Sequence, residues 1–439
     1  MFIVQSGMST DTPHSKGPAT VKQLFQHRAI ITSILLLALA ACVQAQSTTL
    51  SPSTTDTPHY DVATFVQIGG AAPFSYHWSG KGLYFVSSAS GAPQIYRLTE
   101  KGWPYQLTTF DDGVSFMALS YGGTQAVVGA AIGGSEQAQL FLMETETGSL
   151  KQLTNTPAIQ FGSVRWSRDD RSIYYRANAD NRRDFFIYRM DVATGESTRI
   201  FGDTLGLRGS NAIENLSQDG GKLVITHYRT NVYNDLYLLD LTTGKYQKLT
   251  ADSVNAAYAE VTLMPDNRTL LLACNSNADG IARPAKMKIG STAVEYLQDG
   301  WIDPKWEIES ISISQDYRWM AVTYNENGYY RLKLREIESA QELPSPPLSG
   351  SISSVGFDRT GSIVFKFDGP TRTGDVWRWN PAEKQLTQLT FSSYAGIDQR
   401  QFVEPELITY RSSDSLEIPA FQYLPKTYVK GTPIPFVVI

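Results

Sequence analysis

Short apolar runs separated by polar turns recur along the chain from about residue 74 onward. Each unit begins with an apolar residue, continues through a short polar turn and enters a β-rich run. The seven starting triplets are Trp78-Ser79-Gly80, Leu119-Ser120-Tyr121, Trp166-Ser167-Arg168, Leu216-Ser217-Gln218, Leu263-Met264-Pro265, Ile313-Ser314-Gln315 and Phe357-Asp358-Arg359. Their first residues are 41, 47, 50, 47, 50 and 44 residues apart. Seven units of this length predict an all-β fold, a seven-bladed propeller with four-stranded blades.

The polar turn of each unit is typical of a tight hairpin. It often contains Asp or Gly, whose side-chain acceptor or tolerance of positive φ closes such turns. Examples are Asp169-Asp170, Asp219-Gly220-Gly221 and Thr360-Gly361. An alternating run then predicts a strand at 83–86, 173–176, 223–226 and 320–324.

A second pattern closes each unit. Its clearest copy runs from Asp235 to Gly244 and is followed by 246–250, with relatives at 187–195 and 140–148. Each copy predicts a third strand, a turn ending in Gly and a fourth strand. Several fourth strands end in Gln-Leu-Thr, at 106–108, 152–154 and 388–390.

Blade geometry predicts the role of the large aromatic residues. A blade lies between two others, so its central strands are apolar on both faces and its turns project from the ends. We therefore expect Trp78, Trp166, Tyr237, Trp377 and Trp379 to pack between blades and not to form ligand cages. The polar stretch 181–184 is expected to be a solvated turn. No sustained 3.6-residue apolar period occurs between 61 and 398, which predicts very little helix.

The first 41 residues are typical of a secretory signal peptide. The uncharged run from Ala29 to Ala41 follows Lys22 and Arg28 and is too short to span a bilayer comfortably. It ends in Leu39-Ala40-Ala41-Cys42, which resembles a bacterial lipobox. We therefore expect lipid attachment at Cys42, although ordinary cleavage after Ala45 stays an alternative. Residues 42–60 are expected to form a flexible linker. This pattern predicts an exported protein, periplasmic or anchored at the outer membrane.

Composition narrows the function classes. The 439 residues are 42% hydrophobic, 11% aromatic and 18% charged, which is typical of a globular protein. A net charge of -5 gives no basic excess for neutralising phosphates, so nucleic acid is not an expected partner. His77, His227, Cys42 and Cys274 are too scattered to predict a metal cluster, and no cofactor motif is present. We expect Cys274 to be a buried small apolar residue.

No catalytic residue can be assigned from a motif. A Gly-x-Ser-x-Gly nucleophile elbow does not occur, and the nearest string is Gly133-Gly134-Ser135-Glu136-Gln137. Gly244-Lys245 and Gly221-Lys222 lack the upstream glycines of a phosphate-binding loop. His77 and His227 fall inside expected strands and are interpreted as structural.

The repeated motifs carry a family resemblance. The turn with Ser and Asp, paired with Leu-Tyr-x-x-Asp-x-x-Thr-Gly, resembles the propeller repeats of TolB-type proteins and of the prolyl oligopeptidase (S9) family of serine peptidases. The tail 405–426 is similar to the opening hairpin of the S9 α/β-hydrolase domain, with Ser415 where Gly is common, and 432–439 looks like the next strand. The resemblance places the propeller at 61–398 and the beginning of an incomplete hydrolase domain at 399–439.

Two functions follow as expectations. By resemblance, the chain is the propeller part of an exported S9 serine peptidase, which limits access to the catalytic domain to short peptides. Since the Ser-Asp-His triad is missing from these residues, the chain alone is expected to be inactive. The alternative is a TolB-like periplasmic propeller that binds or scaffolds without catalysis.

Overall fold

We describe the fold from a computed structural model of the chain. The structure describes residues 60–74, 82–99, 101–203, 206–297, 299–435 and 437. The predictions for the signal peptide, for Cys42, for the linker up to residue 59 and for His77 and Trp78 lie outside these residues.

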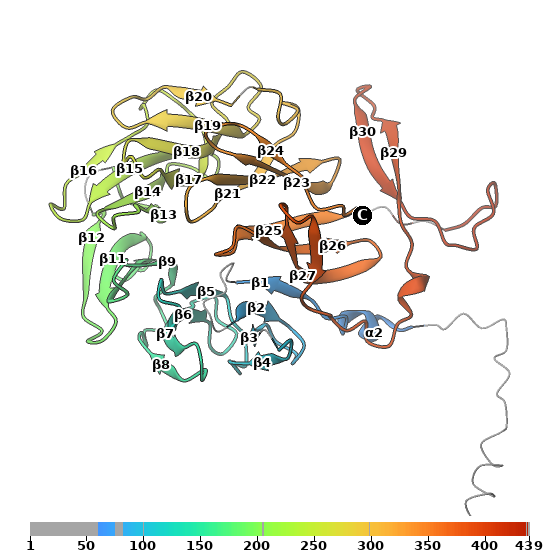
Figure 1. Cartoon of the computed structure of the whole chain (residues 1–439), viewed down its shortest axis with the longest axis horizontal. Helices are drawn as coiled ribbons and strands as arrows, with labels where there is room; N and C mark the ends of the chain where they lie inside the picture. The colour runs from blue at the N-terminus through green and yellow to red at the C-terminus, as the bar shows by residue number, and fades with distance from the viewer. Residues whose placement is uncertain are drawn as a thin grey trace, which may run out of the picture. The chain divides into compact units, whose positions relative to one another are not determined.

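The described residues form seven four-stranded antiparallel sheets and one two-stranded sheet (Figure 1). Blade 1 contains β1 (Ala71–Pro73), β2 (Leu83–Ser87), β3 (Gln94–Leu98) and β4 (Pro104–Gln106). Blade 2 contains β5 (Phe116–Leu119), β6 (Gln125–Ala130), β7 (Gln139–Glu144) and β8 (Leu150–Gln152). Blade 3 contains β9 (Phe161–Trp166), β10 (Ser172–Ala177), β11 (Phe186–Asp191) and β12 (Ser197–Phe201). Blades 4 and 5 contain β13 (Ser210–Leu216), β14 (Lys222–Tyr228), β15 (Asn234–Asp240) and β16 (Tyr246–Lys248); and β17 (Tyr258–Leu263), β18 (Thr269–Cys274), β19 (Arg283–Lys288) and β20 (Val294–Tyr296). Blades 6 and 7 contain β21 (Ile308–Ile313), β22 (Trp319–Glu326), β23 (Tyr329–Glu336) and β24 (Glu342–Leu343); and β25 (Ser351–Phe357), β26 (Ile363–Gly369), β27 (Arg372–Asn380) and β28 (Gln385–Gln388). The predicted seven-bladed propeller is confirmed.

The sequence repeat has a fixed place in this fold. Six of the seven starting residues are described, and each is the last residue of the first strand of its blade: Leu119, Trp166, Leu216, Leu263, Ile313 and Phe357. The polar turn that follows leads into the second strand. In blade 4 the Asp219 carboxylate accepts hydrogen bonds from the Ser217 hydroxyl (2.6 Å) and the Gly221 N–H (2.9 Å). The turn chemistry predicted from sequence is therefore local and repeated.

The hydrophobic core is divided among the gaps between blades. Each of seven buried clusters joins side chains of two neighbouring blades, including one that joins blade 7 to blade 1. Trp379 shows the principle: it is buried, and its indole Nε1–H donates to the Pro344 carbonyl of the preceding blade at 2.8 Å. Tyr237 and Trp377 pack against such clusters as well. For the described aromatic residues, the predicted packing between blades is confirmed.

The Gln-Leu-Thr ending has a structural explanation. The threonine hydroxyl oxygen accepts a hydrogen bond from a backbone N–H of the third strand, as Thr108 does from Ile95 (2.9 Å) and Thr154 from Leu140 (2.9 Å). Thr390 accepts from Val376 in the same way (2.8 Å). The motif therefore fastens the chain leaving the fourth strand to the third strand of the same blade.

The ring closes without exchange of strands. Each blade is built from four consecutive strands, and blade 1 meets blade 7 through side-chain packing and loop hydrogen bonds. The Gly69 N–H donates to the Ser393 carbonyl at 2.8 Å, and the Thr373 hydroxyl donates to the Gly69 carbonyl. The short helix α2 (Val62–Val66) precedes this junction and is capped by Asp61, whose carboxylate accepts the Thr64 N–H at 2.8 Å.

One sequence prediction needs correction. The stretch 181–184 was expected to be a solvated turn, and three of its residues are exposed, but Asp184 is 3% exposed. Its carboxylate accepts hydrogen bonds from the Asn181 amide (2.9 Å) and from the Gly209 N–H (3.1 Å), which belongs to the approach to blade 4. A buried carboxylate is tolerated because these donors replace water. Asp184 therefore joins two blades.

A hairpin follows the last blade. After the 3-10 turn η1 (Gln399–Gln401), β29 (Glu406–Arg411) pairs with β30 (Glu417–Gln422), and Ser415 in the connecting turn has φ 69°, the left-handed region in which glycine is unstrained. The hairpin contacts blade 6 where the Phe421 ring meets the Tyr329 ring edge-on, with centroids 4.9 Å apart. Tyr329 starts β23, so this contact lies at the end of the blade opposite to the first turn. No helix in the described part of the chain is long and apolar enough to cross a membrane.

Candidate functional site

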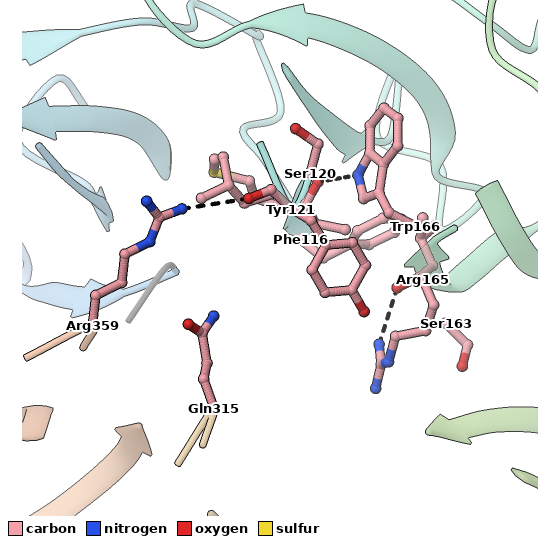
Figure 2. A pocket seen from close by; sticks show the side chains of 12 residues that line it. Phe116, Ser120, Tyr121, Ser163, Arg165, Trp166, Gln315 and Arg359 are labelled. Atoms are coloured by element: carbon pink, nitrogen blue, oxygen red, sulfur yellow. Dashed lines mark hydrogen bonds between the residues drawn. The ribbon is translucent and has the colours of Figure 1, made fainter. Parts of the chain in front are cut away.

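Two adjoining cavities lie along the axis of the propeller, where the first strands of the blades meet. Their volumes are about 390 Å³ and 450 Å³, and both are lined by Tyr121, Gln315 and Arg359. Figure 2 shows Arg359, Gln315 and Arg165 around the same open space, carried by different blades. We call the outer part, at the turns after the first strands, the channel mouth; it is formed by Tyr121, Arg168, Gln315, Tyr317 and Arg359.

Bulges interrupt the regular pairing of the first strands in three blades. Ser163, Glu260 and Ser354 have φ of 51°, 55° and 49°, and the pairing of their strands with the second strands shifts register at these points. A bulge leaves one residue unpaired and redirects its side chain. Ser163 lines the first cavity, and its hydroxyl also joins blade 3 to blade 4 by donating to the Ile213 carbonyl at 3.1 Å. The Glu260 carboxylate joins blade 5 to blade 6, because it accepts the Ile311 N–H at 3.4 Å.

Arg165 lines the first cavity, and the carboxyl groups of Glu214 and Glu260 lie close enough to influence its charge. Solvent reaches Arg165 through the channel, yet the surrounding blades enclose it, and this burial lowers the pKa of its guanidinium, while the charge of Glu214 opposes the change. Burial raises the pKa of Glu214, whose carboxylate accepts the Thr226 hydroxyl at 2.7 Å. Burial likewise raises the pKa of Glu260, and the charge of Glu214 adds to the effect. Each group therefore pays a desolvation cost that its neighbours offset in part.

The channel mouth is organised by stacking and by hydrogen bonds to carbonyls. The Arg168 guanidinium lies over the Tyr121 ring, 4.3 Å from its centroid, and donates to the Ser217 carbonyl at 3.0 Å. Arg359 donates to the Tyr121 carbonyl at 3.4 Å (Figure 2). Burial raises the pKa of the Tyr121 hydroxyl, which stays protonated and able to donate at neutral pH. The mouth thus offers cationic and neutral donors to a ligand.

Of the residues considered from sequence for metal or thiol chemistry, His227 and Cys274 are described, and both are structural. His227 is buried in β14 and its Nδ1 lies 2.9 Å from the Asn211 Oδ1. Cys274 is buried in the cluster between blades 4 and 5, and burial raises the pKa of its thiol, as expected for a packing residue. Within the described ranges, no group of three or more His, Cys, Asp or Glu side chains is placed to hold a metal ion.

Sequence reasoning missed Arg165 and its two carboxylate neighbours, although a signal for them existed. Arg165, Glu214 and Glu260 each occur within three residues before a starting residue of the repeat. A charged residue inside a short first strand is out of place in a sheet covered on both faces. The repeat register could therefore have marked these three residues as charged positions of the innermost strands.

Comparison with known proteins supports the fold but not a family. No model of a known protein family matches the sequence, and no curated protein matches it. A solved prolyl endopeptidase, from a study of inter-domain dynamics in catalysis and specificity, matches with a TM-score of 0.66 at 16% identity over 83% of this chain and 56% of its own. Prolyl oligopeptidase B from Galerina marginata, bound to a 25mer macrocyclization substrate, matches with a TM-score of 0.65 at 14% identity. This match covers 82% of this chain and 55% of that protein.

The fold is similar to the propeller region of prolyl oligopeptidases. At such low identity the likeness concerns the fold alone. The chain spans just over half the length of these relatives. The apo form of the Galerina marginata enzyme matches to the same extent, with a TM-score of 0.64 over 82% of this chain and 56% of that protein.

The pKa shift of Glu214 predicts a pH dependence of stability. Because the folded protein holds this proton to higher pH than the unfolded chain, the contribution of Glu214 to the free energy of unfolding is lost as pH rises above the ordinary value of 4.5. We expect Glu214→Gln to remove this loss, so the variant should gain stability relative to the wild type between about pH 4 and pH 7. Urea denaturation across this range measures the difference. Glu383→Gln, at an exposed position, is the control. If the free energies of unfolding of the wild type and Glu214→Gln differ by the same amount at every pH in this range, the assignment to Glu214 is contradicted.

Proposed function

We propose that this chain is the propeller part of a serine peptidase related to the prolyl oligopeptidases. In this proposal the propeller restricts access to an α/β-hydrolase domain whose catalytic residues are not among these 439. The observation that carries it is the structural match, which covers 82–83% of this chain but only 55–56% of the solved peptidases. A propeller that corresponds to about half of such an enzyme is expected to act together with the other half.

The hairpin at 406–422 supports the proposal. It is the first pair of strands after the last blade and leaves several apolar side chains exposed. Among them are Leu407 and Tyr410 in β29 and Leu416 in the connecting turn, at 45%, 51% and 62%. Exposed apolar residues on a short hairpin are typical of a surface that another part of a protein covers. By resemblance, that part is the rest of the hydrolase domain.

The axial channel supports a filtering role. Its cavities have the volume of a small-molecule site, which admits a few residues of extended peptide but not a folded protein. The channel mouth and the hairpin contact lie at opposite ends of the blades. A peptide that enters at the mouth would therefore cross the propeller before it reached the hydrolase side.

The experiment that tests this function compares two polypeptides. Without a nucleophile elbow, the 439-residue chain should show no labelling by a serine-directed fluorophosphonate probe and no hydrolysis of short chromogenic peptides. A polypeptide extended through the DNA that follows codon 439 should gain both. Labelling of the 439-residue chain itself would contradict the proposal, because an activated serine would then lie within the propeller. An inactive extension would favour a TolB-like binding propeller instead.

We further propose that the protein is exported and anchored to a membrane by lipid on Cys42. Labelled fatty acid should then enter the wild-type protein, and Cys42→Ser should release a soluble exported form. Fractionation of cells expressing each version measures the release. Equal release of both versions would indicate cleavage after Ala45, the alternative that the signal sequence leaves open.

A further inference from the structure

The wall of the axial cavities carries one sign of charge. Its charged side chains are Arg165, Arg168 and Arg359, and among the described residues no aspartate or glutamate lines either cavity. The other polar groups are hydroxyls and amides, such as those of Tyr121 and Asn215, which can donate hydrogen bonds. A wall of this composition favours an anionic ligand over a cationic one.

The two arginines of the channel mouth keep their charge available. Arg168 donates to the carbonyls of Leu216 (3.2 Å) and Ser217 (3.0 Å), and Arg359 donates to that of Tyr121 (3.4 Å). In the described part of the chain, no ion pair joins either guanidinium to a carboxylate. A carbonyl fixes the direction of a guanidinium without neutralising it, so both arginines present a full positive charge to the cavity.

The carboxylates of Asp170 and Asp358, which are close in sequence to these arginines, are held by backbone N–H groups and do not line the cavities. Asp170 accepts the N–H groups of Tyr121 and Gly122, each at 2.7 Å, which orients the turn that carries Tyr121. Asp358 precedes Arg359 but is buried, where it accepts backbone N–H groups of its own turn and pairs with Arg378 at 2.9 Å. Glu214 and Glu260 lie beside Arg165 and offset that charge in part. The excess positive charge therefore lies at the mouth, with Arg168 and Arg359.

We propose that the channel mouth is a binding site for a peptide carboxylate, with Arg359 contacting the anion and Arg168 supplying the second positive charge. The choice of a peptide rests on the proposed function, since peptides are what this channel would admit. Arg359 is exposed and Arg168 is held by its stacking on Tyr121, so one cation can move toward the ligand while the other stays in place. The carboxylate can belong to the C-terminus of the peptide or to an acidic side chain.

Binding to the purified 439-residue chain tests this site. The probes are three dansyl peptides: Gly-Pro-Ala-Ala with a free C-terminus, the same peptide as its amide, and the amide of Gly-Pro-Asp-Ala. Fluorescence anisotropy at low salt should show at least one carboxylate peptide binding about tenfold more tightly than the uncharged amide, the scale of one charge-assisted hydrogen bond. The tighter of the two identifies which carboxylate the site prefers. Equal binding of all three peptides would overturn the proposal.

Variants separate the site from general charge effects. Arg359→Gln should abolish the preference for the carboxylate, while Arg359→Lys should keep most of it because the charge remains. Arg171→Gln is the matched control, because Arg171 is an exposed arginine of the same turn as Arg168 that does not line the cavities. Circular dichroism confirms that each variant folds. The same loss in Arg171→Gln as in Arg359→Gln would also overturn the proposal.

The binding site and the proposed function can fail independently. If the extended polypeptide hydrolyses peptides but the chain binds acid and amide equally, only the carboxylate site is wrong. If the chain prefers the carboxylate and loses this preference in Arg359→Gln while the extended polypeptide stays inactive, only the peptidase function is wrong.

Discussion

Replacing Trp166 by alanine is expected to lower the free energy of unfolding by about 3–5 kcal/mol, the cost of removing a large buried aromatic side chain. Trp166 is 3% exposed and belongs to the cluster that joins blade 2 to blade 3. Its indole Nε1–H donates to the Ala118 carbonyl of the neighbouring blade at 2.8 Å. The substitution therefore opens a cavity between two blades and removes the hydrogen bond from the indole to the Ala118 carbonyl. Urea denaturation followed by circular dichroism measures the cost.

Two further variants make this test specific. Trp103 is 71% exposed, so Trp103→Ala should change the free energy of unfolding by less than about 0.5 kcal/mol. Trp166→Phe keeps most of the packing but removes the donor to Ala118, so its cost should lie between the two alanine variants. A cost below about 1 kcal/mol for Trp166→Ala would show that the indole is not packed between the blades.

Asp375→Ala is expected to cost about 2–4 kcal/mol, because it leaves several buried donors without an acceptor. The Asp375 carboxylate, 3% exposed in β27, accepts the hydroxyls of Thr390 (2.7 Å) and Ser392 (2.8 Å) and the Ser392 N–H (3.0 Å). The carbonyl of the next residue, Ser393, accepts the hydrogen bond from the Gly69 N–H that joins blade 7 to blade 1. The loss should therefore weaken both the last blade and the closure of the ring.

The cause of this loss can be separated from the loss of charge. Burial raises the pKa of Asp375, so the surroundings do not favour its ionised form. We therefore expect the hydrogen-bond acceptors of Asp375 to contribute more to stability than its charge. Asp375→Asn keeps one acceptor oxygen and should cost less than Asp375→Ala. Asp111→Ala, at an exposed position, should have an effect within about 0.5 kcal/mol and serves as the control. Equal costs for the asparagine and alanine variants would contradict this account.

The number and limits of the blades were predictable because their signals are local. A residue such as Leu216 ends the first strand, and the Ser217 to Gly221 turn closes on itself through Asp219. The Thr-Gly turn before the fourth strand likewise depends on residues close in sequence, with Gly244 at φ 68°. Such signals repeat at each blade whatever the rest of the chain does, so one sequence was enough to count them.

The contacts of the polar side chains in the first strands were decided only by the tertiary structure. The strand of Glu260 bulges at that residue, and the carboxylate accepts the Ile311 N–H of the next blade at 3.4 Å. A bulge leaves no fixed mark in a pattern of alternating residues. Asp184 was predicted to be solvated, but its partner is the Gly209 N–H of the approach to the next blade. Arg359 reaches the Tyr121 carbonyl across 238 residues of sequence.

The sequence by itself determined the blades, their order and the packing role of their aromatic residues, since each follows from turn chemistry and alternation within some fifty residues. The tertiary structure decided which polar side chains share the axis, how blade 1 meets blade 7, and that the charges at the channel mouth are positive. The reason is physical. The first strands become neighbours only when the ring closes, so the field in the channel arises from residues of different blades that have no relation along the chain.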